Sequence, residues 1–284
     1  MHKSKKNIFY LLLCSLIRTF VPDMDYTLNC NGRLMDLSEP QVMGIVNLTP
    51  DSFYAASRKQ TEMEIVARCH QILLEGASII DVGACSTRPG GELVSEEEEM
   101  ERQRRGLRII RKELPDAVLS IDTFRPRVAQ MCIEEYGADI INDVEGSDEM
   151  FQTVSRLRIP YVYMTRKASV HDMLIDFAQI VQRLRDLGQK DIILDPGFGF
   201  GKTLEQNFLL LNELDKLLVM ELPLLVGMSR KRMVWQTLKV TPDESLNGTT
   251  VLNTIALQKG ASILRVHDVK EAVEVVKIVS NLKQ

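Results

Sequence analysis

The sequence has no excess of cationic side chains, no closely spaced pair of cysteines and no long apolar run. Its formal net charge of -4 argues against a general nucleic-acid-binding protein, whose surface needs a cationic excess to meet phosphates. The five cysteines form no C-x-x-C pair and no ligand spacing with the four histidines, so neither a disulfide framework nor a zinc site is indicated. This use of cysteine fits a reducing compartment, and we expect a cytoplasmic protein.

The N-terminal segment lacks what a secretory signal or a membrane anchor needs. Its apolar run, Ile8 to Ile17, follows three lysines, but no small-residue cleavage motif comes after it and Arg18 interrupts it. Such a run is also too short to span a bilayer, which takes about 20 residues. We therefore expect no membrane partner, a true start at Met24, and an extension over residues 1–23 that is unstructured or not native. Removing this extension should leave activity and melting temperature nearly unchanged.

The rest of the composition is that of an ordinary soluble protein. Hydrophobic residues make up 45% and charged residues 26% of the chain, which allows a large core. A length of 284 residues exceeds the common domain size, but β/α barrels routinely run to about 250 residues as one domain. We predict a single domain over residues 24–284.

Short apolar runs alternate with amphipathic stretches along the chain. The runs begin near Gln41, Ser78, Val118, Asp139, Pro160, Asp191, Leu224 and Ser262. Helices are predicted between them, for example over Glu62 to Leu74, Val170 to Leu187 and Leu204 to Leu218. Because polar residues follow the runs repeatedly, we predict a TIM-type (β/α)8 barrel with its chemistry at the strand C-termini. A doubly wound sheet is the competing architecture, but it gives no reason for polar groups on all the strand ends.

Local signals mark the ends of these elements. Asn31-Gly32, between Tyr26 to Cys30 and Arg33 to Leu37, predicts a short N-terminal β-hairpin that caps the bottom of the barrel. Ser95 and the glutamates after it predict a capped helix start, and this acidic run is better explained as a solvated first turn than as a metal site. Glycines are expected to close helices at Gly76, Gly137, Gly188 and Gly260.

Seven motifs at the ends of these runs carry a resemblance to a known family. They are Met43–Phe53, Ser86–Gly90, Ile121–Thr123, Ile141–Asp143, Leu194–Lys202, Gly227–Lys231 and Arg265–Asp268. Each is weak alone, but together and in this order they resemble the dihydropteroate synthases, the pterin-binding barrels of the folate pathway. The resemblance implies a transferase that joins 6-hydroxymethyl-7,8-dihydropterin diphosphate to p-aminobenzoate, giving 7,8-dihydropteroate and diphosphate.

A pterin ring has adjacent donors and acceptors along one edge, which a buried carboxylate and a buried amide can bind in paired hydrogen bonds. By resemblance, Asp122, Asn142 and Asp195 take these roles. Each could alone be a helix cap or a loop residue, as Asp and Asn after a strand usually are. Their places at the ends of the third, fourth and sixth barrel strands bring them toward one cavity.

Other residues are assigned to the faces of the ring and to the second substrate. Met164 and Phe200 can serve as apolar platforms, or can be ordinary packing. Lys231 resembles the family lysine that lies along the pterin, and Gly227 opens the same motif. A Schiff-base lysine is the chemical rival, and its Ser-Arg-Lys context argues against that role.

The leaving diphosphate calls for cationic donors. Arg265 and His267, with Arg88, are expected to meet it, and arginine suits phosphate because its donors form a fork. Mg²⁺ prefers oxygen ligands and keeps waters while it bridges phosphates, so one amide oxygen, that of Asn47, can suffice. The segment Gly199–Thr203 lacks the frame of a phosphate-binding P-loop.

Two loops, Thr49 to Lys59 and Ser86 to Glu92, are expected to close over the site and to form the p-aminobenzoate pocket with Phe200. In the second loop, Thr87, Arg88 and Pro89 are expected to bind substrate. We therefore expect p-aminobenzoate to bind poorly until diphosphate and Mg²⁺ are present. The resemblance also implies a homodimer and inhibition by sulfonamides.

The chain departs from the family pattern at three places. It has Gly83-Ala-Cys85 for Gly-Gly-Glu, Tyr54-Ala-Ala56 for Asp-Gly-Gly, and Met164-Thr165 for Met-His. These changes bear on loop closure and inhibitor fit, and leave the pterin contacts intact. Two alternatives stay open on the sequence: a pterin-binding methyltransferase barrel, which needs no site for diphosphate, and a non-catalytic pterin-binding paralogue.

Overall fold

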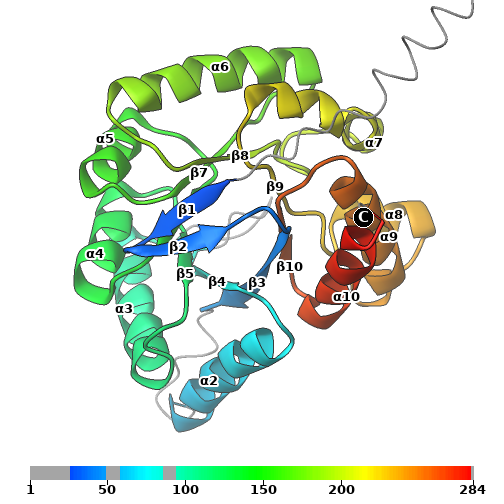
Figure 1. Cartoon of the computed structure of the whole chain (residues 1–284). Coiled ribbons are helices and arrows are strands. Elements are labelled where there is room, and N and C mark those ends of the chain that lie inside the picture. Colours follow the sequence, from blue (N-terminus) through cyan, green and yellow to red (C-terminus); the bar gives the residue numbers. More distant parts are fainter. Residues whose placement is uncertain (1–25, 49–57, 86–93, 283–284) are drawn as a thin grey trace, which may run out of the picture.

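The computed structural model describes residues 26–48, 58–85 and 94–282. Within them, eight strands form one parallel sheet that curves into a barrel (Figure 1). The strands are β3 (Gln41–Asn47), β4 (Ile79–Gly83), β5 (Leu119–Asp122), β6 (Ile140–Asp143), β7 (Tyr161–Met164), β8 (Ile192–Asp195), β9 (Leu225–Val226) and β10 (Ile263–Val266). Each begins one residue or less from its predicted start.

The order of the strands in the sheet identifies the architecture. It runs β8-β7-β6-β5-β4-β3-β10-β9, with every neighbouring pair parallel. A parallel bridge between Leu194 and Leu224 joins the two edges, so the sheet closes on itself. A doubly wound sheet would instead reverse its strand order at a switch point and keep two open edges. The predicted TIM-type barrel is confirmed.

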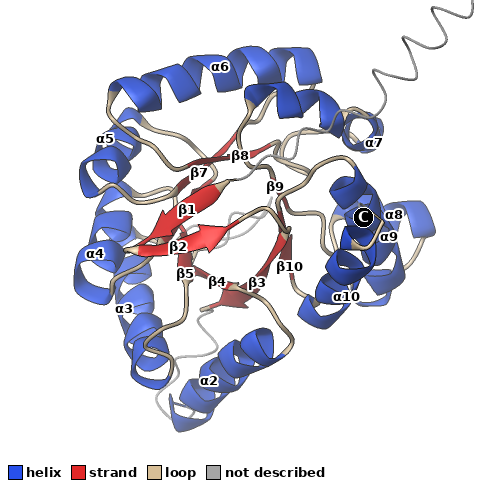
Figure 2. Cartoon of the chain, in the orientation of Figure 1, coloured by secondary structure: helices blue, strands red, loops and turns tan. Residues whose placement is uncertain are grey.

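Helices surround the strands (Figure 2). They are α2 (Arg58–Leu74), α3 (Glu96–Glu113), α4 (Pro126–Tyr136), α5 (Asp148–Leu157), α6 (Val170–Asp186), α7 (Leu204–Asn212), α8 (Arg232–Leu238), α9 (Leu246–Gln258) and α10 (Val269–Ser280), with 3₁₀ turns η2 (Leu214–Met220) and η3 (Asp243–Ser245). None of these described helices has the length and apolarity required to cross a membrane.

The predicted helix ends are confirmed. Ser95 Oγ accepts a hydrogen bond from the backbone N of Glu98 at 3.2 Å, which caps α3. The four glycines expected to close helices all have positive φ, and Gly137 is the left-handed cap of α4 with φ 61°. A residue with a side chain would be strained in this conformation.

One predicted helix is wrong in its extent. The sequence predicts a continuous helix over Leu204 to Leu218, but α7 ends at Asn212 and Glu213 leaves helical geometry with φ -108°. The chain continues as the 3₁₀ turn η2, in which residues three apart lie on one face. This tighter pitch buries both Leu214 and Leu217, so packing of these two side chains overrides the longer helical pattern.

The N-terminal hairpin plugs the bottom of the barrel. Strands β1 (Thr27–Cys30) and β2 (Arg33–Asp36) pair antiparallel through Asn31 and Gly32, which have φ 52° and 86° as a tight hairpin turn requires. Figure 1 shows the hairpin lying across one end of the barrel. Its buried side chains pack on the inward residues near the strand N-termini; this cluster contains Leu28, Cys30, Leu37, Met43, Ile79, Ile140, Val162, Ile193, Leu225 and Ile263.

Candidate functional site

The pterin-binding candidates meet at the carboxyl end of the barrel, opposite the hairpin. Register places Asp122 beside Asn142 on adjacent strands, and Asp195 beside Met164. Gly83 is the register partner of Asp122 on the other side. These residues therefore line one level of the barrel, as their strand-end positions predicted.

Arg265 joins two carboxylates inside this level. Its Nε donates to Asp81 Oδ2 and its Nη2 to Asp122 Oδ2, each at 2.6 Å. The fully buried Asp81 also accepts from Ser120 Oγ at 2.6 Å and from Asn142 Nδ2 at 3.4 Å. Asp81 thus holds the guanidinium of Arg265 and the amide of Asn142 in fixed orientations.

The sequence had placed Arg265 with the diphosphate and did not predict its ion pairs with Asp81 and Asp122. These contacts use the Nε and Nη2 atoms of the guanidinium. Nη1 contacts no acceptor in the part of the chain that the structure describes. The residue can therefore hold Asp122 and still offer a donor to an anion.

Asp122 is poised between its two protonation states. Burial raises the pKa of its carboxyl to about 7, against the lowering effect of Arg265. Its Oδ1 atom is buried and has no hydrogen-bond partner among the described residues. An unpaired buried acceptor of this kind costs free energy until a ligand donates to it. The arrangement suits recognition of a ring N–H.

Asp195 lies at the end of β8 against two lysines. Its Oδ1 accepts the backbone N–H of Gly197 at 2.7 Å, and burial raises the pKa of the carboxyl while Lys231 opposes that rise. Lys231 Nζ donates to Phe198 O at 2.5 Å and lies 4.8 Å from the centre of the Phe200 ring. Burial lowers the pKa of Lys231 to about 8.

Lys202 is a second cation at this place. Its Nζ donates to Gly197 O at 2.9 Å and to Phe200 O at 3.4 Å, and burial lowers its pKa to about 8. These contacts fix the glycine-rich turn after β8, so Lys202 shapes the loop that carries Phe200. The motif Leu194–Lys202 ends in this lysine, whose structural role follows from its contacts with backbone carbonyls and not from the sequence pattern.

His267 and Asn47 line a cavity of about 460 Å³ at the rim of the barrel. Arg68 of α2 donates Nη2 to His267 O at 2.6 Å, and Ser229 Oγ lies 3.2 Å from both the backbone N and Nδ1 of His267. Arg230 also lines the cavity and donates to both carboxylate oxygens of Asp268. Of the predicted diphosphate and metal residues, His267 and Asn47 therefore share this cavity, whereas Arg265 lies inside the barrel on Asp81 and Asp122.

The other predicted residues have mixed outcomes. Met164 is buried at the end of β7, and Gly227 is buried beside Arg265, whose Cβ lies at the ordinary contact distance of 3.7 Å from where a Gly227 Cβ would stand. Thr165, one of the departures, is buried and donates its hydroxyl to Asp176 at 2.6 Å. Thr87, Arg88 and Pro89 lie outside the described residues.

Sequence reasoning missed Asp81 and Ser229 as members of the site. Asp81 had a signal in the sequence, because it is a carboxylate in the middle of the apolar strand β4, where burying an unpaired charge would be too costly. Ser229 had no signal of its own, because a buried serine is common in any core.

Comparison with known proteins gives the class first. A family described as "Pterin binding enzyme" matches residues 43–267, so the barrel and its polar end define a pterin-binding enzyme. The chain is 38% identical to dihydropteroate synthase from Escherichia coli (strain K12) over 265 residues, which covers 87% of this chain and 93% of that protein.

Solved structures agree with this relationship. A Yersinia pestis dihydropteroate synthase in a sulfonamide drug complex has a TM-score of 0.81 and 36% identity, covering 91% of this chain and 99% of that one. The Xanthomonas albilineans dihydropteroate synthase with 4-aminobenzoic acid has a TM-score of 0.83 and 34% identity, covering 91% and 98%. The chain belongs to the dihydropteroate synthase family. These relatives favour a synthase over a methyltransferase barrel.

Proposed function

We propose that the chain condenses 6-hydroxymethyl-7,8-dihydropterin diphosphate with p-aminobenzoate, releasing diphosphate and forming 7,8-dihydropteroate. The observation that carries this proposal is the level of polar residues at the carboxyl end of the barrel, where Asp122, Asn142 and Asp195 lie beside Arg265 and Lys231. Family membership supports the same reaction.

The pterin is bound through its donors. Asp122 Oδ1 is a buried acceptor without a protein partner among the described residues, and Asp195 is a second carboxylate across the barrel. Asn142 donates one amide proton to Asp81, which orients the amide so that its oxygen can accept from the ring. Lys231, beside Asp195 and over Phe200, donates to the ring carbonyl.

The diphosphate is held by Arg265 and His267 in this proposal. Arg265 keeps its charge at all working pH values, because its two carboxylate partners raise its pKa further. Because Arg265 contacts Asp122, which binds the ring in this proposal, one residue connects the ring-binding carboxylate with the diphosphate. Arg88 adds a further donor from a loop outside the described residues.

Mg²⁺ is proposed as the cofactor, and the residues present fit it. Asn47 is exposed at the end of β3, and a Cβ at Gly83 would stand 3.8 Å from Asn47 Oδ1 and 3.6 Å from Asp122 Oδ2, so glycine keeps this space open. One amide oxygen suffices for an ion that keeps its waters and binds substrate phosphates. When bound, the ion would neutralise charge on the diphosphate.

The reaction is a displacement at the exocyclic methylene of the pterin. The arylamine nitrogen forms a bond to this carbon, the bond from carbon to the diphosphate oxygen breaks, and the amine loses one proton to water. Arg265 and His267 stabilise the charge that develops on the departing oxygen. Ring contacts from Asp122 and Asp195 keep the methylene in line with the attacking nitrogen.

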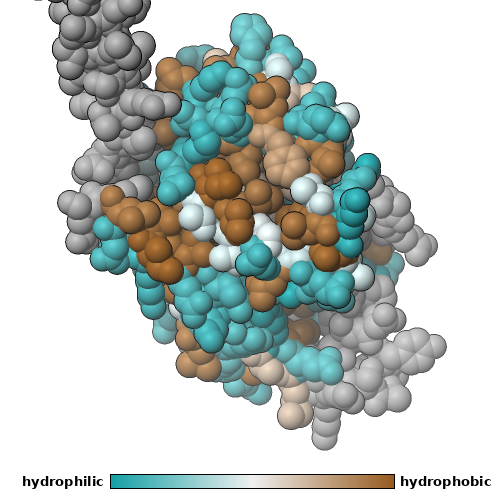
Figure 3. Space-filling view, turned by 90° about the vertical axis from the view of Figure 1, so that its right-hand side faces the viewer, coloured by the Kyte–Doolittle hydropathy of each residue, from teal (hydrophilic) through white to brown (hydrophobic). Residues whose placement is uncertain are grey.

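A homodimer is proposed from the outer surface. Figure 3 shows apolar residues gathered on the side of the molecule that carries α8, α9 and α10. Exposed large apolar side chains of these helices and of α7 are Leu209, Leu238, Val251 and Ile278. Clusters of this kind mark interfaces.

Sedimentation should show a dimer that Val251→Asp dissociates, whereas Ile175→Asp, at an exposed apolar position on α6, should leave it intact.

The decisive assay follows diphosphate release with both substrates, with and without Mg²⁺. We expect release only when both substrates and Mg²⁺ are present, and inhibition by a sulfonamide, which mimics p-aminobenzoate. Pterin binding by calorimetry without any release would instead identify a non-catalytic pterin-binding paralogue. We place the activity in the cytoplasm, because the five cysteines form no C-x-x-C pair and so fit a reducing compartment.

A further inference from the structure

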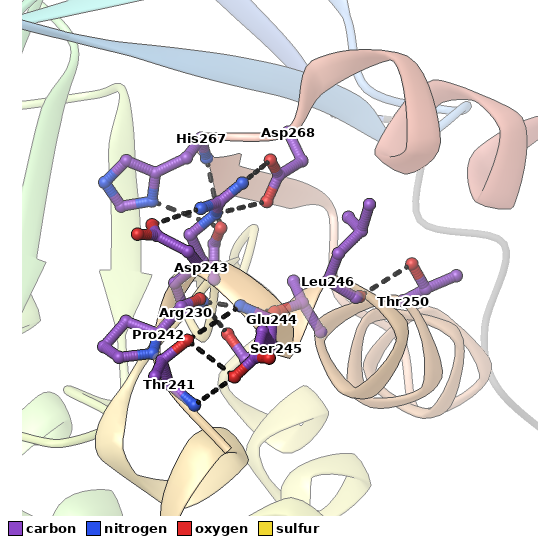
Figure 4. A network of polar contacts seen from close by, with 12 residues as sticks. Arg230, Thr241, Pro242, Asp243, Glu244, Ser245, Leu246, Thr250, His267 and Asp268 are labelled. Atoms are coloured by element: carbon purple, nitrogen blue, oxygen red, sulfur yellow. Dashed lines mark hydrogen bonds and ion pairs between the residues drawn. The ribbon is translucent and has the colours of Figure 1, made fainter.

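The loops after β9 and β10 are joined by two successive contacts. Ser229 Oγ lies 3.2 Å from the backbone N and from Nδ1 of His267. One residue further on each loop, Arg230 donates Nε and Nη2 to Asp268 at 3.0 and 2.6 Å. Figure 4 shows this pairing of Arg230 with Asp268 beside His267. A shift of Ser229 relative to His267 would therefore break the bidentate ion pair between Arg230 and Asp268.

Other elements hold the two loops in this register. Arg230 has φ 54°, a left-handed conformation that is costly for a residue with a side chain and persists only where its surroundings impose it. Its backbone N donates to the buried Thr249 Oγ1 of α9 at 3.1 Å, and its Nη1 donates to Asp243 at 3.0 Å. On the far side, Arg68 holds the carbonyl of His267. These contacts fix the backbone of both loops, and Ser229 Oγ contacts the ring of His267 at Nδ1.

The hydroxyl of Ser229 contacts one of the two ring nitrogens of His267, so its hydrogen-bonding role bears on which nitrogen carries the proton. Ser229 is 5% exposed, and its Oγ accepts the backbone N–H of His267, which leaves one O–H proton to donate. Among the residues that the structure describes, Nδ1 of His267 is in contact with this hydroxyl at 3.2 Å, and the direction of this hydrogen bond depends on the tautomer of the ring. A hydroxyl that donates to Nδ1 leaves the proton of the neutral imidazole on Nε2.

We propose that Ser229 is a positioning residue that keeps His267 in the Nε2–H tautomer, so that Nε2 donates to the diphosphate. The inference rests on the proposed function, because it names the contact that His267 makes with the leaving group. In the other tautomer, Nε2 would present a lone pair to an anionic oxygen, and two acceptors would face each other. The contact would then repel the leaving group instead of stabilising it.

A matched control is available at the other end of the same two strands. Ser262 Oγ accepts the backbone N–H of Leu224 at 3.3 Å, where β9 and β10 begin. Ser229→Ala and Ser262→Ala therefore each remove a hydroxyl that accepts one backbone amide between these strands. Only the first removes a contact with an imidazole.

The tautomer is read directly by NMR of the full chain labelled with ¹⁵N-histidine. The chain has four histidines, and loss of one set of signals in His267→Gln assigns that of His267. We expect the wild-type ring to carry its proton on Nε2, and Ser229→Ala to show a mixture of tautomers. A proton on Nδ1 in the wild type, or an unchanged pattern in Ser229→Ala, would overturn the proposal.

Binding gives the second readout. With Mg²⁺ present, Ser229→Ala should weaken inorganic diphosphate about 3- to 10-fold, the usual worth of one hydrogen bond, and should leave 6-hydroxymethylpterin binding unchanged. Ser262→Ala should change neither. Equal weakening of both ligands would reveal a general structural defect and contradict the positioning role. A wild-type chain that bound no diphosphate would contradict the proposed function instead, while the NMR result would still decide the tautomer.

Discussion

At the scale of single residues, the charges at the carboxyl end of the barrel are held in surroundings that disfavour them. Burial raises the pKa of Asp122 and of Asp195, and it lowers the pKa of Lys231 and of Lys202. A ligand that bonds to the charged forms offsets this desolvation cost. Without a ligand, these charged groups therefore keep an uncompensated desolvation cost. A ligand with matching donors and acceptors lowers the free energy of the site.

Replacing Asp195 by Asn should nearly abolish pterin binding. The amide NH₂ would face a ring donor and leave buried groups unpaired, at a cost of about 1 to 3 kcal/mol or more. Calorimetry with the pterin diphosphate measures the loss. The control is Asp191→Asn, just before the opposite end of the same strand, which should bind pterin normally because it lies near the hairpin. Unchanged affinity in Asp195→Asn would remove this residue from ring recognition.

Pterin affinity should pass through a maximum between about pH 7 and about pH 8. Asp122 must be charged to accept a ring N–H, and its pKa is raised to about 7, so affinity rises as pH increases through that value. Lys231 must be charged to donate, and its pKa is lowered to about 8, so affinity falls above it. Calorimetry across pH 5 to 10 tests this.

The two limbs of this profile belong to different residues. Asp122→Asn should remove the part of the acidic limb centred near pH 7 together with much of the affinity, because the amide no longer titrates, while Asp195 still titrates. Lys231→Arg should remove the basic limb, since a guanidinium keeps its proton throughout this range. A flat profile in the unaltered protein would show that neither group titrates as its burial requires.

At the scale of elements, one buried ion pair and two more exposed ones join α3 to α4 and to Arg125, the residue before α4. Glu99 is fully buried, accepts from Thr123 Oγ1 at 2.6 Å and pairs with Arg125. Arg125 also donates to Val94 O at 2.6 Å, so the pair ties the start of α3 to the start of α4. Between the same helices, Arg127 and Glu96 form a pair in which the arginine side chain is 65% exposed.

These two pairs should differ sharply in their effect on stability. Glu99→Ala leaves Arg125 without its buried partner and should cost about 3 to 5 kcal/mol of unfolding free energy. Glu96→Ala, the matched exposed control, should cost about 0 to 1 kcal/mol because water screens that pair. Urea unfolding of both variants provides the comparison. Similar losses in the two would mean that the buried pair contributes no more than the exposed one.

At the scale of the whole molecule, stability and chemistry lie at opposite ends of the barrel. The hairpin and the inward residues near the strand N-termini make an apolar plug, whereas the carboxyl ends carry Asp122, Asn142 and Asp195. This separation is general in β/α barrels, because loops at the carboxyl end can vary without disturbing the packed interior.

A substitution in the plug should therefore lower stability and leave catalysis intact. Leu28→Ala removes a side chain that is 2% exposed and should cost about 2 to 5 kcal/mol. Leu34→Ala, in the same hairpin at 74% exposure, should change stability by about 0.5 kcal/mol or less. Thermal unfolding measures both, and the turnover per folded molecule should equal that of the parent chain. Reduced turnover in folded Leu28→Ala would show that the plug also shapes the site.

Sequence by itself determined the number and kind of the elements and the end at which the polar residues gather. The apolar runs beginning near Gln41 and Ser78 behave as strands because each is short and bounded by glycine or polar residues. Asn31-Gly32 specified the hairpin through the positive φ that both residues tolerate. Strand ends then identified Asp122, Asn142 and Asp195, since parallel strands of a closed barrel bring their carboxyl ends together.

Only the tertiary structure decided which of these residues touch. Arg265 and Asp81 are 184 residues apart in sequence, and Ser229 and His267 are 38 apart. Their contacts depend on barrel closure, which makes the last strand a neighbour of the first, and on side-chain directions that no local pattern encodes. The break at Glu213 likewise follows from how Leu214 and Leu217 pack, because burial of two side chains outweighs the small difference in local helix propensity.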